Sequence, residues 1–224
     1  NELGIHEFDW EDCGPDRNEM SWWYHSFEPK EKWLHADDRL GRYREVSFPK
    51  GMESWFSLDF DPRKAGWERG LAPFGAADGK QEIISEDLGT CPHDFCACHD
   101  PIHTLWEDDV LLLRGEFEFP PFEEGYRYRL LHGMISHPGS GGGYRLYING
   151  KPFIEQKTGT DRRGGGIPIG GVIPRELWAE FAKGPVTLSA ISFKKHHPRT
   201  GKYGGNLCFF MQRMKVPPVI EPGG

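Results

Sequence analysis

The chain has 224 residues, of which 37% are hydrophobic and 13% aromatic, and it contains 29 glycines and 18 prolines. This composition favours strands and turns over helices, and the length suits one β-sandwich domain with long loops. The formal charge of −7, with Lys and Arg scattered along the chain, argues against a nucleic-acid partner, and no apolar run reaches the roughly 18 residues of a membrane span.

The first half of the chain predicts aromatic strands and ordered loops. Residues 1–53 contain many aromatic and acidic side chains without a sustained period, so we expect them to wrap around the core. Ser54–Phe60 alternates loosely and predicts a strand. Ala65–Gly75 has glycines and a proline around two rings, which predicts an irregular loop. Leu105–Phe119 predicts one long strand, or two strands that meet at Gly115.

The clearest signature is a hairpin that follows a further expected strand at Tyr126–Ile135. Asn149-Gly150 is the favoured dipeptide of a type I′ turn, and the return strand is expected at Pro152–Gln156. Before the turn, Tyr144, Leu146 and Ile148 share one strand face, and Arg145 and Tyr147 share the other.

The last third predicts one helical turn between core strands. Pro174–Phe181 has Pro at a first-turn position and reads as the helix. Pro185–Phe193 and Asn206–Lys215 read as core strands. We therefore expect an all-β, two-sheet antiparallel sandwich with its core in residues 54–217 and a tail at 218–224.

A loop followed by this order of strands resembles the galactose-binding-like β-sandwich, a jelly-roll domain attached to many polysaccharide-degrading enzymes. The similarity covers about residues 54–215. That family tends to carry Trp-x-x-Gly-x-Ala-Pro-x-Gly in the loop, matched here by Trp67, Gly70, Ala72, Pro73 and Gly75. Gly142-Gly143 stands where an aspartate-glycine pair is usual in that family. The resemblance therefore implies no particular ligand-binding residue in this chain. The resemblance implies a fold and a bias toward sugar recognition without catalysis.

Metal-ligating side chains are concentrated between Cys91 and His103. Thiolate and imidazole groups are preferred ligands of zinc, and four that converge would hold together a loop without regular structure. The alternative is a local disulfide from Cys91 to Cys96 or Cys98, because the cysteine spacing matches no standard zinc motif. The candidate ligands of a structural zinc ion are Cys91, His93, Cys96, Cys98, His99 and His103.

Exposed aromatic rings beside polar side chains would form a platform for sugars. The C–H faces of pyranose rings stack on Trp and Tyr, while acidic, amide and guanidinium groups bind the hydroxyls. Adjacent rings in a strand point to opposite faces, so at most half of the candidates can belong to the platform. These candidates are Trp22, Trp23, Tyr24 and Trp106.

Two basic loops, 158–171 and 194–205, are a second candidate surface, suited to an anionic glycan. Guanidinium groups bind carboxylate or sulfate through two parallel hydrogen bonds, whereas the competing interpretation is a pair of solvated loops. The candidate residues in these loops are Arg162, Arg163, His196 and Lys202.

No pattern identifies a catalytic centre, since the nucleophile-elbow and zinc-protease motifs are absent. A set such as Tyr144, His137 and Arg145 has the chemistry for proton abstraction in a lyase.

We expect a non-catalytic carbohydrate-binding or accessory module of an extracellular or periplasmic polysaccharide-processing protein. It would bind a polysaccharide or oligosaccharide and adjoin other domains of a larger protein. The alternatives are a stand-alone jelly-roll glycan lyase or hydrolase, and a structural interaction module held together by metal.

The sequence begins at Asn1 without a basic and then apolar leader, which suits a mature secreted chain or a domain of a longer protein. The five cysteines are too few for a disulfide scaffold. Calcium is a further cofactor that the resemblance alone implies, because such sandwiches often hold it on irregular, carbonyl-rich loops.

Overall fold

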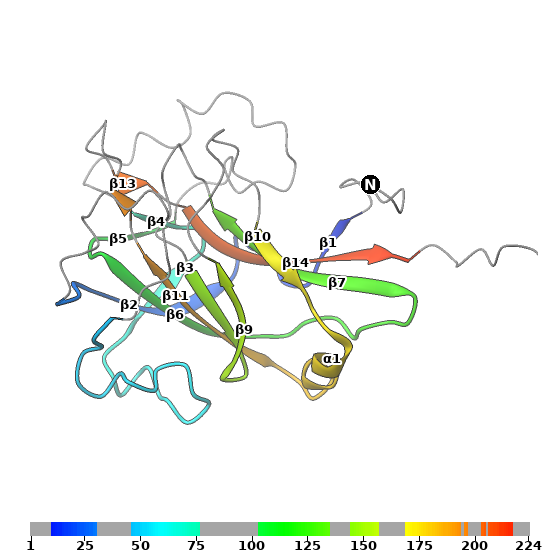
Figure 1. The fold of residues 1–224 in the computed structure, drawn as a ribbon, viewed down its shortest axis with the longest axis horizontal. Coiled ribbons are helices and arrows are strands. Elements are labelled where there is room, and N and C mark those ends of the chain that lie inside the picture. Colours follow the sequence, from blue (N-terminus) through cyan, green and yellow to red (C-terminus); the bar gives the residue numbers. More distant parts are fainter. Residues whose placement is uncertain are drawn as a thin grey trace, which may run out of the picture.

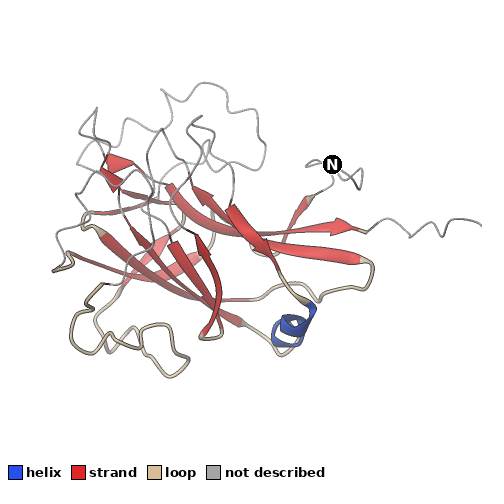
Figure 2. Ribbon diagram, viewed as in Figure 1, coloured by secondary structure: helices blue, strands red, loops and turns tan. Residues whose placement is uncertain are grey.

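The computed structural model describes residues 10–30, 46–76, 103–134, 144–156, 169–193, 195–196, 203–204 and 206–216. Within these ranges the chain forms two large β-sheets that face each other, with one short helix at one end (Figures 1 and 2). The predicted all-β, two-sheet sandwich is confirmed. The described residues contain no helix long and apolar enough to cross a membrane.

The first sheet has the strand order β10-β7-β14-β4-β5, and β1 also pairs with β14. Its described pairs are antiparallel apart from β4 and β5, which are parallel. The strands are β1 (Glu11–Cys13), β4 (Phe74–Ala76), β5 (Thr104–Trp106), β7 (Tyr126–Met134), β10 (Ile169–Val172) and β14 (Asn206–Lys215).

The second sheet has the order β3-β2-β6-β11-β8-β9, and its pairs are antiparallel. Its strands are β2 (Ser21–Phe27), β3 (Glu68–Leu71), β6 (Val110–Phe117), β8 (Tyr144–Ile148), β9 (Lys151–Gln156) and β11 (Val186–Phe193). Helix α1 spans Arg175–Phe181, and two short strands, β12 (Lys195–His196) and β13 (Tyr203–Gly204), pair with each other.

The core between the sheets is filled by alternate side chains of their facing strands. Trp22, Leu111 and Leu113 contribute from the second sheet, and Phe209 from the first. Burying one such side chain contributes on the order of 1.5–3 kcal/mol to stability. This layer is the main hydrophobic core of the sandwich.

A second apolar layer covers the outer face of the second sheet. The segment of residues 46–67 packs there (Figure 1), and its Trp55 belongs to the same buried cluster as Val110, Leu112 and Ile191. The β6 and β11 strands are therefore buried along most of both faces, which explains the continuous apolar run Val110–Leu113 at the start of β6.

The strand predicted at Ser54–Phe60 is wrong, because this stretch folds as consecutive turns. Backbone N–H groups of Trp55 and Ser57 donate to carbonyls three residues earlier, at 3.2 and 2.9 Å. The adjacent rings of Trp55 and Phe56 both contact Tyr147. Successive side chains of a strand point to opposite faces, so a strand could not place both rings on one tyrosine.

Two other boundaries differ from the prediction. The Ala65–Gly75 stretch contains β3 and the start of β4 instead of being a loop throughout. The break within Leu105–Phe119 falls at residues 107–109, and β6 runs through Gly115. A Cβ atom at Gly115 would lie 2.4 Å from the Phe117 ring, so glycine makes room for a ring there instead of making a turn. Residues 10–30 belong to the stretch expected to form strands and ordered loops around the core, and they contribute β1 to the first sheet and β2 to the second.

The predicted hairpin is confirmed in its turn, its faces and its return strand. Asn149 and Gly150 both have positive φ, 48° and 76°, as a type I′ turn requires. The Asn149 side chain accepts a hydrogen bond from the Thr187 N–H (2.9 Å) and donates one to Glu180 (3.2 Å). The turn thereby joins β8 to β11 and to helix α1, which begins after Pro174 as predicted.

Candidate ligand-binding site

Two of the four predicted platform aromatics lie in the core between the sheets. Trp22 is 0% exposed and Trp106 is 3% exposed. Trp22 packs against Phe117 and Phe209, with ring centroids 4.6 and 5.6 Å apart. A sugar cannot stack on a ring without an exposed face, so the structure removes these two residues from the platform.

Tyr24 is half-buried, and its polar end already has a protein partner. Its ring packs against Phe74 at 5.5 Å, and its hydroxyl donates a hydrogen bond of 2.8 Å to Glu68. Burial, followed by this hydrogen bond, raises the pKa of Tyr24 to about 12. The residue therefore ties β2 to the edge strand β3.

Trp23 is the predicted platform residue that reaches the outer face of the second sheet. It is half-buried, and two guanidinium groups lie against its ring. The Cζ atom of Arg69 is 4.9 Å from the ring centroid and that of Arg63 is 5.7 Å away. Each contact of this kind contributes about 0.5–1 kcal/mol at an exposed site.

The strand register aligns Trp23 with polar residues across the sheet. Arg69 lies opposite Trp23 in β3, and Arg114 lies opposite it in β6. Ser189 in β11 pairs with Arg114 and with Tyr147 in β8. Directly opposed residues of antiparallel strands point to the same face, so these five side chains form one row beneath the 46–67 segment.

A pocket of about 470 Å³, which we call the Trp23 pocket, lies over one end of this row. The sheet contributes Trp23, Arg69, Arg114 and Glu116 to its wall, and residues 58–63 form the opposite side. An aromatic ring, hydrogen-bond donors and hydrogen-bond acceptors therefore face a single space. This combination suits a polyhydroxylated ligand that also has an apolar face.

Arg114 is the buried cation of the Trp23 pocket. It is 5% exposed and donates hydrogen bonds to the Ser189 hydroxyl (3.2 Å) and to the Leu58 carbonyl (3.3 Å). Burial lowers the pKa of Arg114, and the nearby Glu116 carboxylate opposes this shift. The residue thus links the sheet to the 46–67 segment at the floor of the pocket.

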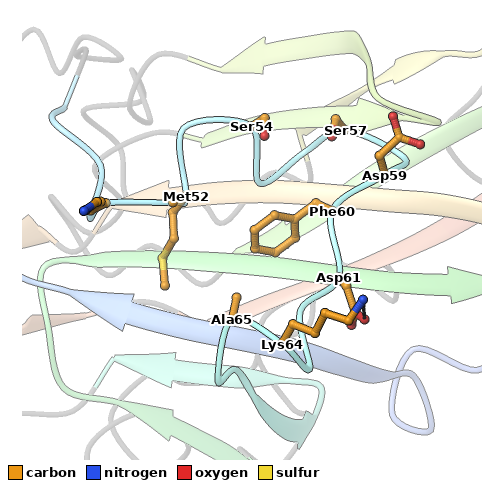
Figure 3. Close-up of a pocket in the computed structure, with 10 residues that line it drawn as sticks. Met52, Ser54, Ser57, Asp59, Phe60, Asp61, Lys64 and Ala65 are labelled. Atoms are coloured by element: carbon orange, nitrogen blue, oxygen red, sulfur yellow. Dashed lines mark ion pairs between the residues drawn. The ribbon is translucent and has the colours of Figure 1, made fainter.

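A second pocket, of about 600 Å³, lies beside the first, and we call it the Phe60 pocket. The two pockets share residues 59–61, so this short segment separates them. Figure 3 shows Met52, Phe60 and Ala65 around the middle of the Phe60 pocket and Asp61 beside Lys64. The Lys64 ammonium lies 3.7 Å from the Asp61 carboxylate.

The charged residues that line the two pockets are mostly cationic, in contrast to the chain as a whole. The five cations are Lys50, Arg63, Lys64, Arg69 and Arg114, and the three acids are Asp59, Asp61 and Glu116. The complete chain has a formal charge of −7. This face therefore offers a local positive excess to an approaching ligand.

The remaining predicted site residues lie mainly outside the described ranges. This applies to Arg162, Arg163 and Lys202 of the basic loops and to Cys91, His93, Cys96, Cys98 and His99 of the zinc set. The backbone of His196 is described, in β12, but its side chain is not. His103 is exposed, and its Nδ1 lies 2.9 Å from the Ala72 carbonyl. Among the described residues, no group of three metal-ligating side chains comes together.

The lyase alternative loses Tyr144, one of the three residues in its example set. Tyr144 is 0% exposed in the core between the sheets, and burial raises the pKa of its hydroxyl far above the ordinary value. A general base must come within hydrogen-bond reach of the substrate, which this position does not allow. His137 of the same set lies outside the described residues.

Apart from Trp23, the residues that line the Trp23 pocket were not predicted, because they come from distant parts of the chain. Arg114 follows the apolar run Val110–Leu113, and the signal was available there. A charged residue inside a strand with two apolar faces needs a special environment. The 58–63 wall gave no such signal, since its first residues were assigned to the strand predicted at Ser54–Phe60.

The sequence matches no protein-family model and none of the curated proteins. Among solved structures it is similar to a β-glucuronidase of glycoside hydrolase family 2, with 14% identity and a TM-score of 0.44 over 94% of this chain and 18% of that one. It is also similar to a β-glucuronidase of an uncultured Clostridium species, with 12% identity and a TM-score of 0.43 over 93% of this chain and 29% of that one. A family 2 glycosyl hydrolase of Bacteroides cellulosilyticus is similar with 11% identity and a TM-score of 0.42 over 92% of this chain and 21% of that one.

The chain thus spans less than a third of the length of each of these three proteins. The two-sheet sandwich follows from the strand pairing described above.

Proposed function

We propose that this chain is a non-catalytic carbohydrate-binding module whose sugar site is formed by the Trp23 and Phe60 pockets. The observation that carries this proposal is the lining of the Trp23 pocket, where one indole ring, three guanidinium groups and three carboxylates surround a single space. Sugars need an aromatic surface for their C–H face and charged or polar groups for their hydroxyls. A solvent-filled structural gap has no need of this combination.

The two adjoining pockets favour an oligosaccharide over a single sugar. They share residues 59–61 and have volumes of about 470 and 600 Å³. Each volume is in the range of small-ligand sites, which is about 300–1,000 Å³. A chain that crosses residues 59–61 would place one sugar unit on either side.

Several finer assignments belong to this proposal. They are a galactose-binding-like jelly-roll topology, an extracellular or periplasmic location, and a role beside other domains of a polysaccharide-processing protein. Binding of an anionic glycan by Arg162, Arg163, His196 and Lys202, a structural zinc ion and a calcium ion are also proposals. They rest on the sequence patterns and on the resemblance already described.

The test is a glycan array followed by calorimetric titration of the best oligosaccharide. We expect binding by the unmodified chain without release of shortened or unsaturated products. Trp23→Ala should weaken binding at least tenfold, because a stacked aromatic contributes about 1.5 kcal/mol or more at a binding site. Product release would contradict the non-catalytic assignment.

Trp10→Ala is the matched control variant. Trp10 is also a half-buried tryptophan under a guanidinium group, with Arg129 Cζ 4.1 Å from its ring. Arg129 belongs to β7 of the first sheet, so the control removes the same kind of contact from a different sheet. Equal losses in the two variants would place the sugar elsewhere.

A further inference from the structure

Arg114 is a buried charge with weak local compensation. Its guanidinium group has five N–H donors, and the described contacts use two of its nitrogens, on neutral acceptors at 3.2 and 3.3 Å. The other outer-face residues of β6 include Val110 and Leu112, both 0% exposed. An apolar residue at position 114 would continue that face without the cost of a buried cation.

The three guanidinium groups of the Trp23 pocket share one feature in the described part of the chain. Among the described residues, Arg63, Arg69 and Arg114 form no ion pair with a carboxylate. Arg69 instead donates a hydrogen bond of 2.6 Å to the Ser21 hydroxyl. Of the three, Arg114 is buried, whereas Arg63 and Arg69 are exposed. A desolvated cation without an ion pair gains more from an incoming anion than an exposed cation does. The pocket is therefore prepared for a negatively charged group.

The carboxylates in the same pocket narrow the choice of anion. Asp61 is already engaged, since it accepts a hydrogen bond from the Arg63 backbone N–H (3.0 Å) and lies beside Lys64. Asp59 and Glu116 are exposed and make no described ion pair. A bare sulfate or phosphate would be repelled by these two groups and would offer them no donor. A ligand that carries hydroxyl groups together with its negative charge can bind the guanidinium groups through the charge and donate hydrogen bonds from its hydroxyls to the two carboxylates.

We infer that the Trp23 pocket recognises the carboxylate of an acidic sugar, with Arg114 at the floor of the subsite and Arg69 and Arg63 at its sides. This inference rests on the proposed sugar site and names the chemistry of its ligand. Guanidinium groups bind a carboxylate through paired hydrogen bonds. The sugar hydroxyls donate to Asp59 and Glu116, and the C–H face of the ring lies near Trp23.

The experiment titrates the unmodified chain with matched pairs of uronic acid-containing oligosaccharides and their carboxyl-reduced counterparts. Sulfated oligosaccharides form a third arm. The acidic member of one or more pairs should bind at least tenfold more tightly than its reduced counterpart, because charge-assisted hydrogen bonds are about twice as strong as neutral ones. Added salt should narrow that difference.

The variants separate the carboxylate subsite from general effects. Arg69→Gln should weaken binding of the acidic member more than binding of the reduced member, and it should thereby remove most of the preference between the two. Arg69→Lys should keep only part of the preference for the acidic member, since an ammonium group cannot form the paired hydrogen bonds. Arg127→Gln, which changes an exposed strand arginine of the first sheet, is the control and should leave the preference unchanged. Arg69 and Arg127 are both exposed, so loss of folding does not complicate the comparison.

Each outcome is decisive. Equal binding of acidic and reduced members overturns the carboxylate inference and leaves the proposed sugar site standing. Tighter binding of sulfated chains than of uronic acid chains also overturns it. Absence of binding in all three arms overturns the proposed function and the inference together. An equal loss of preference in Arg69→Gln and Arg127→Gln places the anion outside the Trp23 pocket.

Discussion

Trp22 and Trp23 are neighbours in β2, yet one ring fills the core and the other borders a pocket. Alternation along a strand predicts that adjacent rings separate in this way. It does not predict which ring points inward, because both faces of the strand carry aromatic residues, Trp22 and Tyr24 on one face and Trp23 and Phe27 on the other. The structure decides the question through the register with β6, which places Trp23 opposite Arg114.

Replacement of each tryptophan by alanine should therefore have different consequences for stability. Trp22→Ala should lower the free energy of unfolding by about 3–5 kcal/mol, because it leaves a cavity in the core. Trp23→Ala should lower it by about 1 kcal/mol or less, since this ring is half-buried. Urea denaturation of the two variants measures the difference. Equal losses would mean that the core side of β2 has been misassigned.

His25 lies two residues after Trp23, on the same face of β2, and its ring stacks against two aromatic rings. The ring centroids of Phe27 and Trp67 are 6.2 and 6.0 Å from that of His25. Burial lowers the pKa of His25 from its ordinary value of 6.5, and the carboxylates of Asp108 and Glu68 partly oppose the shift. Between the lowered pKa and 6.5, the unfolded chain binds more protons than the folded chain does.

The contribution of His25 to stability should therefore be complete above about pH 6.5 and should be lost as the pH falls through its lowered pKa. His25→Asn lacks this titration but leaves the other acidic groups in place. The difference in free energy of unfolding between the unmodified chain and His25→Asn should shift against the unmodified chain from about pH 7.5 to about pH 5. A difference that does not change with pH would contradict the assigned burial.

At the level of elements, the turn of the β8–β9 hairpin is the feature that local sequence determines most completely. Its two residues supply the positive φ values, and the Asn149 side chain also bonds to β11 and to α1. Asn149→Ala should cost about 2–3 kcal/mol, because it adds backbone strain and removes two hydrogen bonds.

Asn149→Gly tolerates the turn conformation but removes the same two hydrogen bonds, so it should cost about 1–2 kcal/mol. Thermal unfolding of both variants checks the order. A glycine variant less stable than the alanine variant would show that backbone strain is not part of the effect.

Elements whose sequence pattern lies within their own residues were predicted well. The β14 strand has the predicted bounds, β11 begins one residue later than expected, and α1 follows Pro174 as expected. The prediction failed at residues 54–60, where loose alternation was taken for a strand. Those side chains are arranged by contact with the sheet beneath them, through Trp55 and Phe56 on Tyr147, and not by pairing with a neighbouring strand.

At the level of the whole molecule, two apolar layers share the β6 and β11 strands. Leu111 and Leu113 face the core between the sheets, whereas Val110 and Leu112 face the layer under residues 46–67. Loss of either layer therefore exposes one face of the same two strands. We expect the two layers to unfold together.

Far-UV circular dichroism and tryptophan fluorescence should consequently give coincident denaturation curves. Trp55→Ala, which removes a 1% exposed ring from the outer layer, should shift both curves to lower denaturant by the same amount. Separate transitions, with fluorescence changing first, would show that the 46–67 segment detaches independently of the sandwich.

The same long-range organisation explains why the candidate site was only partly predictable. The residues that line the Trp23 pocket come from β2, β3, β6 and the 58–63 turns. The first of them, Ser21, and the last, Glu116, are more than 90 positions apart in the sequence. Residue types suggested an aromatic sugar platform, and Trp23 was among its candidates. The partners of Trp23 depend on strand order and register, which local patterns do not encode.

The most direct test of the sugar site is a crystal structure of the chain with the tightest-binding oligosaccharide from the array. We expect the glycan to cross residues 59–61, with one sugar beside Trp23 and within hydrogen-bond distance of Arg69 or Arg114. An oligosaccharide bound at another surface, with the Trp23 and Phe60 pockets empty, would contradict it.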